Sequence, residues 1–173
     1  GASFSQNFTV TVTDVNEEPT AIALSATAID ENAAGAVVGT LTTTDVDAGD
    51  SHTYTLSGTD ASLFEIVNGQ LKLKDTESAD YETQTSYSVT VTATDAGELT
   101  TEETFTVSVN NLNDNDPIIS SASSVDMAEN TSAVITVTAT DADGDNLTYS
   151  ITGGADSSLF TIDSTTGALT LQA

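Results

Sequence analysis

The sequence predicts an all-β protein of tandem antiparallel sandwiches, and three observations support that prediction. Apolar residues alternate with threonine and serine in several short segments, which is the period of half-buried strands. No segment sustains a helical period, and clusters of glycine, aspartate and asparagine separate the alternating segments. The chain also repeats itself at a regular spacing, so the same sandwich is expected more than once.

Four segments show the alternation most clearly. Each is predicted to form a strand, because β-branched and aromatic side chains suit a pleated surface. Short strands with turn residues between them are typical of a sandwich. In chain order the four segments are residues 8–13, 87–94, 105–109 and 134–139.

The internal repeat has a period near 97 residues, the size of one immunoglobulin-like sandwich. Residues 8–16 and 105–113 share five identities in nine, at an offset of 105 − 8 = 97. The two prolines, Pro19 and Pro117, lie 117 − 19 = 98 positions apart.

This period predicts three parts in the chain. Residues 1–13 are expected to be the last strand of an upstream repeat, and residues 14–113 a complete repeat. Residues 114–173 are expected to be a second repeat, cut before its last two strands. A last strand without its own sandwich is a candidate to add to the open repeat of another molecule.

The charge balance excludes several classes of function. There are 27 acidic and 2 basic residues, a net charge of −25, and the basic residues are Lys72 and Lys74. Nucleic-acid binding is excluded because it needs clustered Lys and Arg, and no apolar run is long enough for membrane insertion. The single histidine, His52, is predicted to be an ordinary loop or strand-end residue. Paired carboxylates without any Trp to stack on a sugar do not indicate glycoside hydrolysis, so the chain is predicted not to be an enzyme.

Acidic residues gather at loop positions. Several carboxylates brought together without cations would repel one another, so a bound cation is expected. Ca²⁺ suits this set, because it takes about six to eight oxygens from carboxylates, amides and carbonyls. Zinc and copper are disfavoured, since the chain has no cysteine and one histidine. The clusters are Glu31-Asn32, Asp45-Val46-Asp47, Asp80-Tyr81-Glu82, Asp95-Ala96-Gly97 and the linker at 111–117.

These motifs, in their order and spacing, resemble the cadherin repeat. That family has Glu-Asn early in the repeat, Asp-x-Asp after the second strand and Asp-Arg-Glu in mid-repeat. It also has Ala-x-Asp-x-Gly near the sixth strand and a linker Asp-x-Asn-Asp-Asn-x-Pro. The segments that correspond here are 31–32 and 129–130, 45–47 and 141–143, 80–82, 93–97 and 111–117. The resemblance implies tandem seven-stranded Greek-key, immunoglobulin-like β-sandwiches of cadherin type.

In that family three Ca²⁺ ions lie at each junction between consecutive repeats. By position, the resemblance implies a first ion held by Glu31, Asp80, Glu82 and Asp114. A second ion would use Glu31, Glu82, Asn111, the carbonyl of Leu112, and Asp143. A third would use Asn113, the carbonyl of Asn115, Asp141, Asp143 and a carbonyl near Asn146. The third site is expected to be weakened, because its usual partner in the next Ala-x-Asp-x-Gly motif would fall beyond Ala173.

Two departures from the family pattern bear on these sites. Asn111 replaces the usual Asp, so the second ion is expected to bind less tightly. The upstream junction keeps only Asp14, Asn16, Asp45, Asp47 and Asp95, and at most one partly hydrated ion is expected there. An EF-hand loop starting at Asp141 is disfavoured, because its twelfth position would be Thr152 rather than Glu.

The resemblance implies a calcium-rigidified extracellular rod at the cell surface, in which neighbouring repeats of the same chain share the ions. The Thr/Ala-rich, acidic composition is similar to that of the cadherin-like repeats of large bacterial surface adhesins. The function favoured is a spacer or adhesive segment of such an adhesin, since the sequence shows no exposed aromatic group. Two alternatives stay open. One is a carbohydrate- or self-binding adhesion module, with a polysaccharide or another surface protein as partner, and the other is an accessory module of a secreted enzyme.

Overall fold

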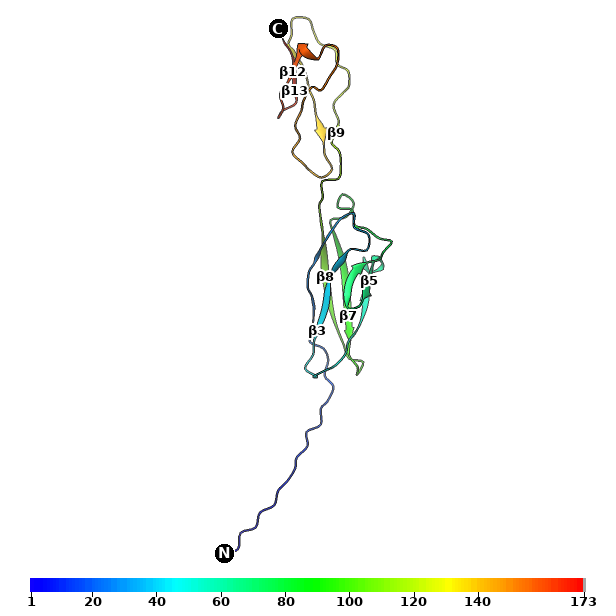
Figure 1. The fold of residues 1–173 in the computed structure, drawn as a ribbon, viewed down its shortest axis with the longest axis vertical. Coiled ribbons are helices and arrows are strands. Elements are labelled where there is room, and N and C mark those ends of the chain that lie inside the picture. Colours follow the sequence, from blue (N-terminus) through cyan, green and yellow to red (C-terminus); the bar gives the residue numbers. More distant parts are fainter. Residues whose placement is uncertain (173) are drawn as a thin grey trace. The chain divides into compact units, whose positions relative to one another are not determined.

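The computed structural model describes residues 1–172, which fall into two compact units divided between Asn110 and Asn111. Both units are all-β (Figure 1), with one short 3₁₀ turn each, Ala61–Leu63 in the first and Ser157–Leu159 in the second. Among the described residues, no helix is long and apolar enough to cross a membrane.

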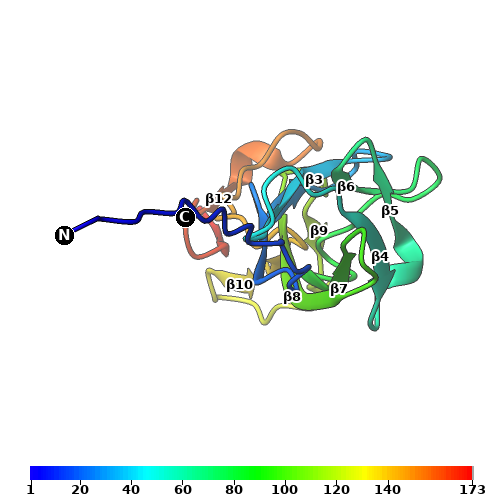
Figure 2. The same cartoon turned by 90° about the horizontal axis from the view of Figure 1, so that it is seen from below.

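The first unit is a sandwich of two four-stranded sheets. One sheet has the order β1 (Ala21–Leu24), β3 (Val37–Thr44), β6 (Gln70–Leu73) and β5 (Phe64–Val67). The other has the order β2 (Ala28–Asp30), β8 (Thr100–Asn110), β7 (Ser86–Thr94) and β4 (Thr53–Ser57). Figure 2 shows β3, β6 and β5 in one layer and β8, β7 and β4 in the other.

The eight strands of this unit correspond to the seven that were expected, because the first strand is divided between the sheets. β1 pairs antiparallel with β3, and β2 pairs parallel with β8. The short segment 25–27 carries the chain from one layer to the other.

The alternating segments of the first unit place their apolar side chains in the core between the sheets. Val89, Val91 and Val107 are 0% exposed, and the threonines that alternate with them face outward. Across the layers, the rings of Phe64 and Tyr87 meet edge to face with centroids 5.7 Å apart. The strands predicted at 87–94 and 105–109 are therefore confirmed.

The second unit has shorter strands. β10 (Ala133–Thr136), β13 (Ala168–Leu171) and β12 (Phe160–Ile162) form a three-stranded sheet, and β9 (Ile118–Ile119) pairs with β11 (Ala139–Thr140). The single strand predicted at 134–139 is thus broken in two. Val137 N–H donates to the carbonyl of Gly167 at 2.8 Å, and between β10 and β11 the pairing partner changes from β13 to β9.

The strand predicted at 8–13 does not form. Residues 1–20 belong to no strand, and residues 1–18 are exposed (Figure 1, blue). An alternating sequence becomes a strand only when a neighbour takes up its backbone hydrogen bonds, and no described segment pairs with this one. Phe4 and Phe8 are 91% and 82% exposed, so the inference that the chain has no exposed aromatic group was wrong.

Candidate metal centres

Three carboxylates converge at one end of the first unit. Asp45 follows β3, Asp50 precedes β4 and Asp95 follows β7, so the three strands bring them to the same end of the sandwich. One carboxylate oxygen from each lies within 4.8 Å of the others. Asp95 is 6% exposed, and Asp50 Oδ2 is a buried oxygen with no hydrogen-bond partner.

Backbone groups hold two of these carboxylates in place. Asp47 N–H donates to Asp45 Oδ1 at 2.9 Å, and Leu99 N–H donates to Asp95 Oδ1 at 2.8 Å. The first of these bonds is the main reason why the pKa of Asp45 lies below its usual range, with His52 contributing further. The loops therefore present the Asp45 and Asp95 carboxylates in defined positions.

The segment before β1 reaches this end of the sandwich. Asn16 Nδ2 donates to Asp95 Oδ2 at 2.9 Å, and Glu17 N–H donates to Asp47 Oδ2 at 2.9 Å. Desolvation, followed by the nearby charge of Asp47, raises the pKa of the exposed Glu17 carboxyl. Of the residues predicted for the upstream junction, Asn16, Asp45, Asp47 and Asp95 are thus connected by hydrogen bonds or proximity, whereas Asp14 is exposed on the preceding segment.

His52 lies at the end of a strand, directly before β4, which is one of its two predicted positions. Its contact with the carboxylate cluster was not predicted. Its Nε2 lies 3.0 Å from Asp45 Oδ2, and the two side chains are only 11% and 5% exposed. A carboxylate accepts but does not donate, so Nε2 carries the proton of this hydrogen bond. The imidazole therefore holds Asp45 Oδ2, while the Asp47 amide holds Oδ1.

The opposite end of the first unit carries Glu31, which is 2% exposed. Glu31 follows β2, and its Oε2 accepts the Tyr81 N–H at 2.8 Å. The next residue, Asn32, has a positive φ of 63°, and Asn130, at the same place in the second unit, has a φ of 62°. Asparagine tolerates this left-handed conformation better than most residues, which gives the Glu-Asn motif a structural cause.

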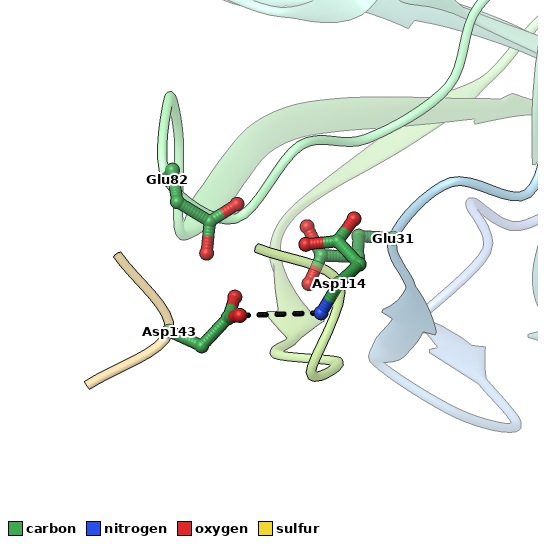
Figure 3. A group of neighbouring side chains, drawn as sticks. All are labelled: Glu31, Glu82, Asp114 and Asp143. Atoms are coloured by element: carbon green, nitrogen blue, oxygen red, sulfur yellow. Dashed lines mark hydrogen bonds between the residues drawn. The ribbon is translucent and has the colours of Figure 1, made fainter. Parts of the chain in front are cut away.

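The mid-repeat motif lies beside Glu31. Carboxylate oxygens of Glu31 and Glu82 lie within 4.8 Å of each other, and both side chains are drawn in Figure 3. Asp80, predicted to share an ion with them, accepts bonds from Thr83 N–H at 3.0 Å and Thr83 Oγ1 at 2.9 Å. Those bonds close the turn that carries Glu82 towards β7.

In the second unit, Asp143 is the centre of a network with the linker. Its Oδ2 accepts the backbone N–H of Asp114 at 3.2 Å (Figure 3) and that of Asn115 at 2.8 Å. Its own carbonyl accepts from Asn111 Nδ2 at 2.9 Å. Asp114 and Asp143 also offer carboxylate oxygens within 4.8 Å of each other.

The remaining predicted ligands of the second unit surround this network. Asp141 Oδ1 accepts the N–H groups of Asp143 at 3.0 Å and Asp145 at 3.4 Å, which closes the Asp-x-Asp loop. Asn113 Nδ2 donates to Asp145 Oδ2, so the loop is tied to the linker a second time. Leu112 and Asn146 are exposed, Leu112 within the linker and Asn146 at the end of the loop.

The donor sets fit a hard cation. Every predicted side-chain ligand offers carboxylate or amide oxygen, and Asp50 Oδ2 is a buried acceptor without a hydrogen-bond partner. The sequence reasoning missed Asp50 and His52. Asp50 lies five residues after Asp45, outside the Asp-x-Asp motif. The alternation of residues 53–57, which was not used to predict a strand, was the available signal that Asp50 directly precedes one.

Comparison with known proteins points to one family. The family model "Cadherin domain" matches residues 25–110. Protocadherin Fat 4 of Homo sapiens is 35% identical over an alignment of 173 residues, which covers 91% of this chain and 3% of that protein. The chain spans only 3% to 11% of the curated relatives it matches.

Solved structures agree. Human Protocadherin-24 EC1-2 superimposes with a TM-score of 0.67 and 25% identity, over 92% of this chain and 79% of that one. Mouse Cadherin-23 EC22-24 superimposes with a TM-score of 0.71 and 27% identity, over 90% of this chain and 54% of that one. The predicted fold class, all-β with immunoglobulin-like sandwiches of cadherin type, is confirmed. The chain is a cadherin-type extracellular repeat segment and belongs to the cadherin domain family.

Proposed function

We propose that this segment binds Ca²⁺ and acts as a calcium-rigidified spacer or adhesive segment of a large bacterial cell-surface adhesin. The observation that carries the calcium proposal is the cluster of Asp45, Asp50 and Asp95. Each offers one carboxylate oxygen within 4.8 Å of the others, and Asp50 Oδ2 is buried without a hydrogen-bond partner. The bacterial context rests on the Thr/Ala-rich, strongly acidic composition.

The protein's own cations do not neutralise this cluster. Lys72 bonds Glu65 at 3.3 Å and Asp75 at 2.5 Å, and Lys74 donates to the Ser62 carbonyl. His52 donates one hydrogen bond to the cluster, to Asp45. Three carboxylates this close repel one another, and binding a cation or a proton reduces that repulsion. At neutral pH a divalent cation reduces the repulsion more effectively than a proton does.

The donor chemistry favours Ca²⁺ over other divalent ions. Carboxylate, amide and carbonyl oxygens at flexible spacing are its usual ligands, whereas Mg²⁺ demands a near-ideal octahedron. Zn²⁺ prefers cysteine and histidine, and the chain has no cysteine. We therefore assign Asp45, Asp47, Asp50, Asp95 and Asn16 to one Ca²⁺ site at the upstream end of the first repeat.

A second group of ions is proposed where the first repeat continues into the linker. Glu31, Asp80 and Glu82 would supply the ligands of the first repeat. Asn111 follows the last residue of β8 directly, and the carbonyl of that residue, Asn110, accepts the Glu31 N–H at 3.4 Å. The linker therefore starts beside Glu31. The ligands proposed beyond it are Asn111, Leu112, Asn113, Asp114, Asn115, Asp141, Asp143 and Asn146.

Shared ions of this kind would stiffen the chain. With ligands on both repeats and the linker, bending would break metal–oxygen bonds. Binding only to the ordered state would also stabilise the folded repeats, by about 2.7 kcal/mol at a hundredfold excess over Kd. Small-angle scattering with and without Ca²⁺ tests whether Ca²⁺ stiffens the chain. An unchanged distribution of inter-repeat distances would refute the stiffening.

Isothermal titration calorimetry tests the calcium proposal at the cluster of Asp45, Asp50 and Asp95. Asp50→Asn keeps the side-chain volume but removes the orphaned charge, so it should remove or strongly weaken one class of Ca²⁺ sites. Glu103→Gln is the matched control, because it removes one charge from an exposed position of β8 outside the cluster. Equal stoichiometry and affinity in wild type, Asp50→Asn and Glu103→Gln would count against the site.

A self-binding adhesive role is the second candidate. The exposed apolar residues Phe8, Val10 and Val12, between 82% and 89% exposed, favour it.

A further inference from the structure

Negative charge greatly outnumbers positive charge in the first unit. Residues 1–110 contain 18 acidic side chains and the chain's 2 lysines, so their formal side-chain charge is 2 − 18 = −16. A compact structure holds like charges closer together than an unfolded chain does. Self-repulsion therefore destabilises the folded state, by an amount that depends on how well the solvent screens the charges.

The charges are concentrated where the strands end. The strands of the first unit contain only four of the 18 acidic residues, which are Asp30, Glu65, Glu102 and Glu103. The other 18 − 4 = 14 lie in the loops and in the segment before β1. β3, β4 and β7 contain no acidic residue. Repulsion therefore acts mainly on the closure of the loops at the two ends of the sandwich.

The two lysines are placed towards one of these ends. Lys72, on β6, bonds Glu65 at 3.3 Å and Asp75 at 2.5 Å. Lys74 follows β6 directly and donates to the carbonyl of Ser62. Both lysines thus lie towards the end of the sandwich at which β6 finishes, and their bonds are made there.

The opposite end has carboxylates but no lysine or arginine. Three of its carboxylates, on Asp45, Asp50 and Asp95, each offer an oxygen within 4.8 Å of the others. In all, the connecting segments at this end contain eight acidic side chains and one histidine, and they comprise residues 14–20, 45–52 and 95–99. We refer to these residues as the lysine-free end. Repulsion between loops is expected to be strongest there.

The charge of the loops also reaches the core. Tyr87 is 6% exposed and packs edge to face against Phe64. Burial raises the pKa of the Tyr87 hydroxyl most, and the negative charges of Asp60, Asp80 and Glu77 raise it further. Carboxylates of two loops thus act together on one buried side chain, which is the behaviour of a summed field rather than of isolated pairs.

We propose that the first unit is a salt-responsive fold. In the absence of divalent cations, monovalent salt keeps the unit closed by screening its carboxylates, and dilute solution opens it from the lysine-free end. Raising the ionic strength from about 0.01 M to about 1 M shortens the screening length from about 30 Å to about 3 Å, so repulsion between loops is almost abolished. No specific ion-binding position is needed, because screening acts on all exposed charges at once.

The first experiment is a thermal melt of the whole chain in EDTA, at increasing NaCl and, in parallel, at increasing choline chloride. The proposal predicts that the melting temperature rises with ionic strength equally in both salts, because screening does not depend on the identity of the cation. A melting temperature that is independent of salt overturns the proposal. A rise in NaCl alone also overturns it, because that result would show a specific sodium site.

A pair of charge substitutions separates screening from a general effect of salt on folding. Thr106 is exposed on β8, opposite Ser88 on β7. At low salt Thr106→Lys should raise the melting temperature and Thr106→Glu should lower it, and the two variants should converge at high salt. Because lysine and glutamate are both disfavoured in strands, their difference measures the effect of charge. Equal melting temperatures at low salt, or a difference that persists at high salt, would refute repulsion as the cause.

Hydrogen exchange locates the place where opening begins. The Asp95 N–H bonds the Leu99 carbonyl at 3.0 Å at the lysine-free end, and the Leu73 N–H bonds the Ala36 carbonyl at 2.9 Å near the lysines. When salt is diluted in EDTA, the Asp95 amide should lose protection before the Leu73 amide does. Loss in the reverse order, or at the same salt concentration, would refute the assigned starting point.

The salt response and calcium binding are tested separately. All three experiments on the salt response exclude divalent cations, so their failure leaves the calcium proposal intact. Failure to bind Ca²⁺ would likewise leave the salt response intact, because screening by monovalent salt involves no metal ligand.

Discussion

Asn16 Nδ2 donates to Asp95 Oδ2 at 2.9 Å, so the segment before the first repeat is tied to the carboxylate that follows β7. Gly97 lies against the same amide, because a Cβ on it would clash with Asn16 Nδ2. The Asp-x-Gly of the Ala-x-Asp-x-Gly motif thus has two separate physical roles. Asp95 binds the incoming segment, and the glycine makes room for it.

His52 is expected to position Asp45 for the metal. His52→Ala removes the hydrogen bond to Asp45 Oδ2 and should weaken Ca²⁺ binding at the upstream site by about tenfold, as loss of a ligand's supporting bond does elsewhere. His52→Gln should restore part of the affinity, because an amide can donate the same bond. Calorimetry measures both, with Ser51→Ala as the exposed neighbouring control. Unchanged affinity in His52→Ala would exclude the positioning role.

Leu71 tests the core of the first unit. It is 0% exposed on β6, between β3 and β5. Leu71→Ala should lower the free energy of unfolding of this unit by about 2–5 kcal/mol, from lost transfer energy and the cavity left behind. Hydrogen exchange of the β7 amides measures this loss of stability. Leu159→Ala, at a position 50% exposed, should leave the same amides protected.

Gly39 tests a close approach of two backbone segments. A Cβ at this position would lie 2.8 Å from Ala26 N and 2.8 Å from Ser25 Oγ. Gly39→Ala should therefore destabilise the first unit by about 1–3 kcal/mol through overpacking, where the chain passes from β1 to β2. Thermal unfolding measures the change. Gly153→Ala is the control, because nothing lies within 4 Å of its added Cβ.

Asp163 makes the β12–β13 hairpin sensitive to acid. Its Oδ1 accepts the N–H groups of Thr166 at 2.8 Å and Thr165 at 3.0 Å, and the Thr166 backbone bond is the main cause of a lowered pKa. A lowered pKa in the folded state means that the carboxylate stabilises the hairpin above its ordinary pKa of 3.8. That stabilisation is lost as the pH falls through the lower, folded-state pKa.

Hydrogen exchange of the Thr166 amide, measured as a function of pH, tests the acid sensitivity of the hairpin. In wild type, protection should fall on acidification below the ordinary carboxyl pKa, and in Asp163→Asn it should be lower at neutral pH and nearly independent of pH. Asp156→Asn is the control, since Asp156 precedes a 3₁₀ turn without capping it through its side chain. A wild-type profile in Asp163→Asn would contradict the assignment.

Local pattern was sufficient to predict the strands that have partners. The alternation at 87–94 and 105–109 matches β7 and β8, because one face of each packs against the opposite sheet. The same alternation at 8–13 forms no strand, since pairing depends on a neighbour that the local sequence does not describe. The break of 134–139 at Val137 has the same origin, because its N–H bonds Gly167 outside the ladder.

For the candidate site, the motifs identified the carboxylates but not the residues around them. The Asp-x-Asp and Asp-x-Gly motifs pointed to Asp45 and Asp95. Asp50 and His52 lie in the following loop, and only the fold of that loop brings one to the carboxylate cluster and the other onto Asp45. Their roles depend on three-dimensional contacts that spacing alone does not specify.

The most direct test of the central claim is a thermal melt of this chain in EDTA and across a Ca²⁺ series, with Mg²⁺ as the control. The account predicts a melting temperature that climbs with Ca²⁺ well beyond the effect of Mg²⁺, because only the folded state assembles the carboxylates. Asp50→Asn should reduce that climb, and Glu103→Gln should not. A melting temperature indifferent to Ca²⁺ would contradict the account and leave the carboxylate clusters as acidic surface.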